Sequence, residues 1–594
     1  MLNGLSVSTL FADAPVVEFR PSATHCSVCG CELKVQKTRR RAVTTLHVGR
    51  IRAQEVFLYC PLCDSTHRSE ELCSLVPPGA NFGYDVMAYA GKALHLRHRN
   101  EAEVVAELAQ KNVHISPREV SLLGMKFIVY LAIAHQRRAA DITADMQTRG
   151  GYVCHLDATC EGRDPLLMSS LDSLSGIVLG NVKLPAEDEA HIVPFLERIK
   201  KQFGIPLALV HDMGKGILKA VATVFPKVPD FICHFHFLRD IGKDFLGSDY
   251  DIIRNRLKKH GISAKLRYLA KQLKGDIDGN VTLLDALEAG ITDVTLPSAA
   301  LALIPVGVCY ALIQWALRGK SAGHGYGFPF DRPHLTFAKR IHHIHNDLEA
   351  IRCIKLRGVR EWKDNNPYHK IYHALSPLMK DKVLWKAVDE IEKKITVFER
   401  LRKAMRIAPQ SGGHGLNDEA NNGNMRTIEA RVKKFRTRLT NNKDYQQKPD
   451  AKKMIEQIDR YWEKLFADPI TVQTPSGPMD IHPQRTNNIL EQFFRSLKRA
   501  SRRKTGNASS GRMLRTMLAE TPLVRNLENP NYMKLLLNGN ASLEEVFAEI
   551  EIKTLRETFH EAQKSPEKIP AKLKPLIDMP QLPEKLVDMI KNAA

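Results

Sequence analysis

Two aspartates of this chain each end a predicted strand, and their type and place suit metal-dependent chemistry. Asp157 closes the apolar part of "GYVCHLDATCEG", and Asp212 closes "IPLALVHD"; both segments have the short apolar pattern of buried strands. If the two strands are parallel neighbours, both carboxylates emerge at the same carboxyl edge of the sheet, where open α/β sheets bind ligands. Adjacent carboxylates repel each other, and hard oxygen ligands suit Mg²⁺ or Mn²⁺ between them.

A third carboxylate, Glu491, lies near the start of "RTNNILEQFFRSLKRASRRKTGN", residues 485–507. Apolar residues recur there at helical spacing, so the segment is predicted to be an amphipathic helix. Packed on the sheet edge, this helix would bring Glu491 to the two aspartates and complete a two-metal site for phosphodiester chemistry. The cations of this segment and one upstream arginine are predicted to hold a DNA backbone: Arg485, Arg495, Lys498, Arg499, Arg502, Arg503 and Arg118.

Each acid also has a purely structural interpretation. Asn488 and Glu491 have the spacing of a capping box, in which Glu491 would only satisfy the start of the helix. Asp157 and Asp212 are also ordinary turn residues after strands. The metal interpretation is favoured because the three acids occur in order, each in the right kind of element. Asp172, on a predicted hairpin, is a spare acidic candidate.

Four cysteines near the N-terminus have the spacing of a structural zinc site. Cys26 and Cys29 form one C-x-x-C pair, and Cys60 and Cys63 form a second. Two such pairs, joined by alternating basic and apolar residues, predict a zinc ribbon in which four thiolates bind Zn²⁺. Redox pairs or buried structural cysteines are the alternative. Three nearby residues are candidate substitutes for one ligand: His25, Cys31 and His67.

The residues that follow predict a pair of helices suited to DNA. A short helix ends near Leu108, and residues 112–115 form a turn. Ser116 is a good N-cap, Pro117 suits the first helical position, and Glu119 completes a capping box, so a second helix begins there. Two helices joined by a short turn are a helix-turn-helix candidate, although many structural helix pairs have the same pattern.

The order of elements after residue 150 predicts an α/β fold with a mixed sheet. Three strands, the last two forming a hairpin, precede a helix; a strand, a helix and a final strand follow. We therefore expect six regions along the chain: a zinc ribbon (1–78), a helix-turn-helix (79–148), the first part of an α/β core (149–245), an all-helical insertion (246–480), the last core helix with Glu491 (481–525) and a helical tail (526–594).

The charge of the chain indicates a polyanionic partner. Its 594 residues carry a formal net charge of +21, and the sequence pI is about 9.4; nucleic acid is the expected partner, and an anionic membrane surface is the rival.

The apolar run Ser298 to Leu317 is long enough to span a membrane, but Pro305, Gly307 and Gln314 interrupt it. We expect a buried helix pair there and no membrane partner. The N-terminus lacks the pattern of a secretion signal, and the eleven cysteines are expected to be reduced.

Together these motifs resemble those of DDE transposases with an RNase H-like core, most closely the Mutator-like group and its prokaryotic insertion-sequence relatives. "HLDAT" around Asp157, "HDMGKGI" around Asp212 and "TNNILEQFFRSLKR" around Glu491 resemble the three catalytic blocks of that family. Cys233 and His236, followed by "FLRD", resemble the C-x-x-H element of the group, which implies a role near the active site. A buried structural pair is an equal alternative for these two residues.

The resemblance implies a transposase that binds the ends of its own element through its N-terminal modules. Asp157, Asp212 and Glu491 would hold Mg²⁺ or Mn²⁺ for DNA cleavage and strand transfer. Since both element ends must be held together, we expect a homodimer or larger assembly on double-stranded element and target DNA, in the cytoplasm with the nucleoid if the host is prokaryotic. Two alternatives stay open: an RNase H-fold nuclease such as a resolvase, and a non-catalytic DNA-binding regulator derived from a transposase.

Overall fold

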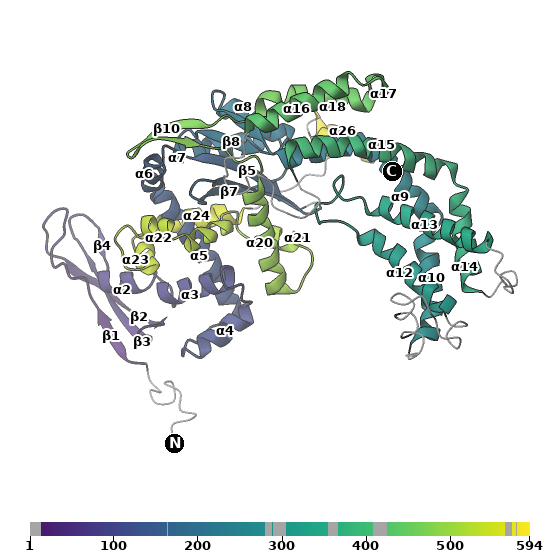
Figure 1. The fold of residues 1–594 in the computed structure, drawn as a ribbon. Helices are drawn as coiled ribbons and strands as arrows, with labels where there is room; N and C mark the ends of the chain where they lie inside the picture. The colour runs from purple at the N-terminus through teal and green to yellow at the C-terminus, as the bar shows by residue number, and fades with distance from the viewer. Residues whose placement is uncertain are drawn as a thin grey trace. The chain divides into compact units, whose positions relative to one another are not determined.

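The computed structural model describes residues 14–162, 164–278, 285, 288, 304–353, 366–407, 425–564, 573–577 and 579–593 (Figure 1). The chain divides into two compact units. The first combines Met1–Ile232 with Pro469–Ala594, and the second is Cys233–Asp468. In sequence the second unit is therefore an insertion into the first, and it begins and ends somewhat before the predicted insertion, 246–480.

The N-terminal part of the first unit is a four-stranded sheet. Its strands are β1 (Val16–Phe19), β2 (Lys34–Thr45), β3 (Gly49–Tyr59) and β4 (Thr66–His67). β3 pairs antiparallel with β2 and β4, and parallel with β1. Val43 and Ile51 pack with Leu72 of helix α2 (Glu70–Leu75) in a small core. The alternating segment between the two cysteine pairs is thus a β-hairpin.

Four more helices follow α2. They are α3 (Tyr84–His95), α4 (Glu101–Ala109), α5 (Pro117–Arg137) and α6 (Ala139–Thr148). Ser116 caps α5 as predicted, since its hydroxyl accepts a hydrogen bond from the N–H of Glu119 (3.2 Å). The predicted helix pair is therefore α4 and α5. α5 is mainly a core helix, however, because most of it beyond Val120 is buried.

The predicted α/β region is a five-stranded mixed sheet. Its strands are β5 (Val153–Thr159), β6 (Leu166–Asp172), β7 (Val178–Leu184), β8 (Ala208–His211) and β9 (Asp230–Ile232). The order is β7-β6-β5-β8-β9, with β5, β6 and β7 antiparallel and β5, β8 and β9 parallel. Helix α7 (Glu189–Phe203) links β7 to β8, and α8 (Lys215–Val224) links β8 to β9. The predicted mixed α/β architecture and element order are confirmed.

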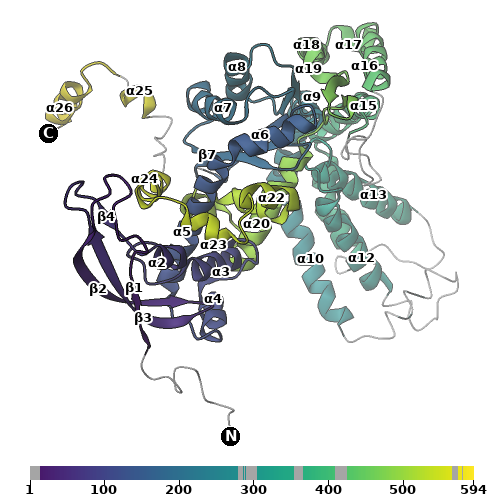
Figure 2. The ribbon, with the colours of Figure 1, turned by 90° about the vertical axis from the view of Figure 1, so that its left-hand side faces the viewer.

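The last part of the chain returns to this sheet. A hairpin of β10 (Ile470–Thr474) and β11 (Gly477–Ile481) packs Val472 and Ile481 against Val153 of β5. The helices that follow are α20 (Asn488–Thr505), α21 (Gly511–Thr516), η3 (Thr521–Glu528), α22 (Pro530–Leu537), α23 (Leu543–Ala548), α24 (Ile552–Gln563), α25 (Lys574–Ile577) and α26 (Leu582–Ala593). α23 and α24 contact α5, and Figure 2 shows these three helices close together.

The regular elements that the structure describes in the second unit are all helices. They are α9 (His234–Lys259), α10 (Ile262–Ile277), α12 (Ile304–Arg318), η2 (Gly319–Ser321), α13 (Pro333–Cys353), α14 (Pro367–Met379), α15 (Lys382–Met405), α16 (Met425–Thr440), α17 (Lys443–Gln446), α18 (Pro449–Arg460) and α19 (Trp462–Leu465). The first part of the predicted apolar pair, 298–303, lies outside the described residues. Within the described ranges, no helix has the length and apolar character needed to cross a membrane.

Gly91→Ala is expected to destabilise the first unit. A Cβ at Gly91 would lie 2.1 Å from Cγ of Phe127 in α5, so α3 and α5 would have to separate. Overpacking of this kind costs about 1–3 kcal/mol, and thermal unfolding followed by circular dichroism should begin about 2–6 °C lower. The matched control is Gly247→Ala in α9, where a Cβ meets nothing within 4 Å. A loss as large in the control as at Gly91 would contradict the close approach.

Candidate metal centre and candidate active site

The two C-x-x-C pairs meet at one end of the N-terminal hairpin. The start of β2 pairs with the end of β3, so the loop that precedes β2 lies beside the loop that follows β3. The sulfur atoms of Cys26, Cys29, Cys60 and Cys63 all lie within 4.8 Å of one another, and those of Cys29 and Cys60 are 3.3 Å apart. Tetrahedral zinc with Zn–S bonds of about 2.3 Å needs sulfurs about 3.8 Å apart. The group therefore has the size and chemistry that Zn²⁺ requires.

Both cysteine loops have the same backbone hydrogen bonds. The N–H of Gly30 donates to the carbonyl of Cys26 (2.9 Å), and the N–H of Asp64 donates to the carbonyl of Cys60 (3.0 Å). The φ angles of Gly30 and Asp64 are +71° and +53°, in the left-handed region that glycine adopts freely and aspartate tolerates. The two loops are thus matching knuckles that present their sulfurs to one point.

The four thiols do not titrate alike. Hydrogen bonds from the N–H groups of Val28 and Cys29 lower the pKa of Cys26 to about 6, whereas a hydrogen bond with Cys29 raises the pKa of Cys63 to about 12. Zn²⁺ would displace the protons that remain, because its ligands are thiolates. The three candidate substitutes bond to their own neighbours and are not members of the group: His25 to Thr24, Cys31 to Glu32 and His67 to Ser65.

Cys63→Ser is expected to reduce bound zinc from about one ion per chain to near zero, because a tetrahedral structural site needs all four ligands. Cys31→Ser, a change of the same kind just outside the group, should keep about one ion per chain. Mass spectrometry of the metal content after dialysis against zinc-free buffer measures both variants. Equal zinc contents in the two would contradict a four-thiolate centre.

The register of the central sheet aligns Asp157 with Asp212. β5 and β8 are parallel neighbours, and their paired residues end with His155 opposite Val210. Two residues further along each strand, the same register puts Asp157 opposite Asp212. Asp157 lies within β5, which continues beside β6 to Thr159, whereas Asp212 directly follows β8. Adjacent strands are about 4.8 Å apart, so the predicted meeting of the two aspartates at the carboxyl edge of the sheet agrees with this geometry.

The surroundings of Asp212 add an acid that the sequence pattern did not single out. The N–H of Gly214 donates to Oδ1 of Asp212 (2.9 Å). A Cβ at Gly214 would lie 3.1 Å from that oxygen and 2.3 Å from Oε1 of Glu187, so Glu187 is close to the same edge. It was missed because it directly precedes Asp188, the N-cap of α7, and the short acidic run there is typical of a helix start.

Buried Asn487 attaches the start of α20 to β5. Its side-chain N–H donates to the carbonyl of Leu156 (2.7 Å), and its Oδ1 lies 2.9 Å from Nδ1 of His155. Asn487 is fully buried. The N–H of Glu491 donates to the carbonyl of Asn487 (3.0 Å), so Glu491 lies one helical turn, about 6 Å, beyond this attachment. Because side chains alternate along a strand, His155 shares its face of β5 with Asp157, so the start of α20 is attached on the face of β5 that carries Asp157.

The capping-box interpretation of Glu491 is wrong. Helix α20 takes Asn487, not Asn488, as its N-cap, and no side chain caps it. The Asn487 side chain is already engaged with β5, which is a tertiary contact that the local sequence pattern does not reveal. Glu491 is partly exposed in the first turn of α20.

The spare candidate Asp172 organises a turn instead. Its buried carboxylate accepts hydrogen bonds from the N–H groups of Val153 (3.1 Å), Leu174 (3.0 Å) and Ser175 (3.0 Å). In the β5–β6 register it is opposite Cys154, three residues before Asp157. Asp172 is therefore about 10 Å along the sheet from the aspartate edge, and its hydrogen bonds account for its burial.

The three acids do not form a closed ligand group. Among the described histidine, cysteine, aspartate and glutamate side chains, the four cysteines are the one set of three or more whose ligand atoms all lie within 4.8 Å of one another. The carboxylate oxygens of Asp157, Asp212 and Glu491 are therefore not all within 4.8 Å of one another.

The predicted DNA-binding residues differ in exposure. Arg495, Arg499, Arg502 and Arg503 are exposed on α20, and Lys498 is partly buried. Together these five residues are named the α20 basic strip. Arg118, in the first turn of α5, is also exposed.

Arg485 is only 3% exposed, which does not agree with its predicted contact to DNA. It is buried because it lies two residues before Asn487, whose side chain is hydrogen-bonded to β5. Cys233 and His236 lie at the start of α9 in the second unit and belong to no group of three or more metal ligands in the described part of the chain.

Comparison with known proteins finds no family model that matches this chain and no curated protein that matches it.

Asn487→Ala is expected to loosen α20 from the sheet. It would leave the carbonyl of Leu156 and Nδ1 of His155 buried without their partner, at about 1–3 kcal/mol for each group. Hydrogen exchange of the first turn of α20 should accelerate by at least about 10-fold. Asn488→Ala, a change of the same kind at the next, partly exposed position, should leave the exchange rate within about 3-fold. Similar rates in the two variants would show that the Asn487 side chain does not hold the helix.

Proposed function

We propose that this chain is a DDE transposase, an enzyme that binds the ends of its own DNA element and catalyses metal-dependent cleavage and transfer of DNA strands. The observation that carries the proposal is that the strand with Asp157 is aligned with Asp212 and is also bonded to the start of the helix with Glu491. Asp157 and Asp212 are aligned by strand register, and Glu491 lies one helical turn beyond the attachment of Asn487 to β5. The α20 basic strip begins one turn after Glu491.

In this proposal Asp157, Asp212 and Glu491 bind Mg²⁺ or Mn²⁺, because carboxylate oxygens are the ligands these ions prefer. The ions would activate the attacking oxygen, first of water and then of the freed 3′-hydroxyl, and stabilise the leaving oxygen. The chain would hold the carboxylates of Asp157 and Asp212 on two neighbouring strands and that of Glu491 on α20. The α20 basic strip would position the DNA backbone without reading its sequence.

Other features support the same proposal. The mixed sheet with helices agrees with an RNase H-like core, and the helical second unit agrees with the family's all-helical insertion. The cysteine knuckles and the α4–α5 pair are candidate modules for the element ends. The net charge of +21 favours double-stranded DNA as partner. Because two ends must be joined, the active assembly would be a homodimer or larger, at the nucleoid if the host is prokaryotic.

Purified chain should cut a supercoiled plasmid that carries the gene with its native flanking DNA, at the element boundaries and only with Mg²⁺ or Mn²⁺. Asp157→Asn, Asp212→Asn and Glu491→Gln should each lower cleavage by at least about 100-fold, since each removes a charged metal ligand. Mapping of the 3′ ends and of joined products measures cleavage and strand transfer.

The matched control is Glu197→Gln, which neutralises an exposed acid on α7 and should cut like the unmodified chain. Cleavage without strand transfer would favour a nuclease such as a resolvase. If all of these proteins bind the DNA and none cuts it, the chain is a DNA-binding regulator and the catalytic proposal is wrong.

A further inference from the structure

Helix α20 is attached to the rest of the first unit at both of its ends. Its start is bonded to β5 through Asn487. After its far end the chain turns into α21, and Ser510 at the start of α21 is bonded to Glu161 in the loop after β5. We propose that Glu161 is a positioning residue, which fixes the direction of α20 and thereby the place of Glu491 relative to β5. This inference rests on the proposed function, in which Glu491 is a metal ligand.

The bonds between Glu161 and Ser510 are charge-assisted and shielded from water. Oε2 of Glu161 accepts hydrogen bonds from both the hydroxyl and the N–H of Ser510. These bonds lower the pKa of Glu161, so its carboxylate is charged at neutral pH. Hydrogen bonds to a charged group are about twice as strong as those between neutral groups. Ser510 is only 7% exposed, so water competes little for its two donors.

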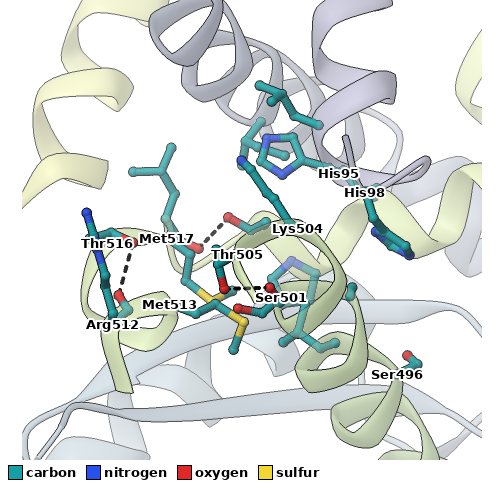
Figure 3. A pocket seen from close by; sticks show the side chains of 18 of the residues that line it. His95, His98, Ser496, Ser501, Lys504, Thr505, Arg512, Met513, Thr516 and Met517 are labelled. Carbon is teal, nitrogen blue, oxygen red and sulfur yellow. Dashed lines mark hydrogen bonds between the residues drawn. The ribbon is translucent and has the colours of Figure 1, made fainter. Parts of the chain in front are cut away.

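Other polar contacts at this end of α20 are more exposed to water. Lys504, shown in the last turn of α20 in Figure 3, is paired with Glu101 of α4 (2.8 Å). Arg515 of α21 is paired with Asp164 (3.1 Å), and its carbonyl accepts a hydrogen bond from Lys183 (3.0 Å). The side chain of Arg515 is 64% exposed. Because exposed ion pairs contribute little, we expect Glu161 to be the main attachment here.

Local hydrogen bonds connect the last turn of α20 to Ser510. The N–H of Gly506 donates to the carbonyl of Arg502 (2.8 Å), and the φ angle of Gly506 is +70°, the left-handed conformation that commonly ends a helix. The N–H of Asn507 donates to the hydroxyl of Thr505 (3.3 Å). The turn is therefore ordered by its own bonds, and holding Ser510 restrains the end of the helix.

Two separated attachments fix the direction of a helix, whereas one attachment leaves it free to tilt. The fully buried residues of α20 do not secure its far end, because all of them lie in its first two turns: Leu490, Phe493 and Phe494. The 18 residues of α20 span about 27 Å. A tilt of about 10° around Asn487 would move the far end by about 5 Å and the backbone of Glu491 by about 1 Å. A misplacement of about 1 Å can lower a reaction rate about 100-fold.

The test measures kcat and KM for cleavage of the plasmid with native flanking DNA by the full-length chain in Mg²⁺. Glu161→Ala should lower kcat at least about 10-fold, while KM for DNA changes by less than about 3-fold. The Mg²⁺ concentration for half-maximal cleavage should rise at least about 3-fold, because one ligand is misplaced. Glu161→Gln should keep kcat within about 3-fold of the unmodified chain, since its amide oxygen can accept the same two hydrogen bonds.

A second variant tests whether Glu161 acts through Ser510. Ser510→Ala removes the hydroxyl bond and keeps the N–H bond, so it should lower kcat by about 3-fold. Combined with Glu161→Ala, it should lower kcat no further, because residues that act through one contact are not additive. The matched control is Glu557→Ala, the same change at an exposed glutamate of α24, which should cut like the unmodified chain. Thermal unfolding of each variant shows whether it is folded.

Three results would overturn the inference while the transposase proposal stands, because the unmodified chain still cuts. In the first, Glu161→Ala cuts like the control. In the second, Glu161→Gln loses as much activity as Glu161→Ala, which would assign the role to the charge and not to the bonds with Ser510. In the third, kcat falls only with the melting temperature and the Mg²⁺ requirement is unchanged. An unmodified chain that binds the DNA and does not cut it contradicts both proposals.

Discussion

The candidate active site depends on two hydrogen bonds made by one buried amide. Asn487 joins the start of α20 to Leu156 and His155 of β5, so segments more than three hundred positions apart in the sequence share one edge. The bonds are made in a buried setting, where losing either partner costs about 1–3 kcal/mol. The same amide is therefore unavailable to cap its own helix. α20 begins without a side-chain cap and relies on the burial of Leu490, Phe493 and Phe494 instead.

Two buried histidines, His155 and His211, lie on the strands that precede or carry the aspartates. Burial lowers the pKa of His155 to about 4, so this histidine is uncharged. Its hydrogen bond with Oδ1 of Asn487 therefore makes Nδ1 the protonated nitrogen, since an amide oxygen only accepts. His211, on β8, is buried beside Asp212, with Nδ1 2.7 Å from the carbonyl of Asp212 and Nε2 3.3 Å from Oδ2 of Asp230. Each histidine thus bonds a segment beside one of the two aspartates: His155 bonds Asn487, and His211 bonds Asp230.

The features that the sequence predicted correctly depend on residues that are close together in the sequence. Strand alternation, helix periodicity and cysteine spacing are properties of neighbouring residues, and the mixed sheet, the cap of α5 by Ser116 and the four-cysteine group followed from them. The failures concern partners that lie far away in the sequence. The local spacing of Asn488 and Glu491 permits a capping box, but the attachment to β5 shifts the helix start by one residue. Arg485 is cationic like its neighbours, yet the same attachment buries it.

The contrast between the two candidate metal centres follows from the charge of their ligands. A thiol can donate its proton to a neighbouring thiolate, so cysteine sulfurs can lie close together, as the 3.3 Å separation of Cys29 and Cys60 illustrates. Carboxylates are ionised, and two of them 4 Å apart repel by about 4 kcal/mol at an effective dielectric constant near 20. Carboxylates on an aligned backbone are therefore expected to stay apart unless a cation lies between them. In the proposed function, a divalent cation between the carboxylates would offset this repulsion, and the attachment of α20 to β5 through Asn487 would hold the helix that carries Glu491.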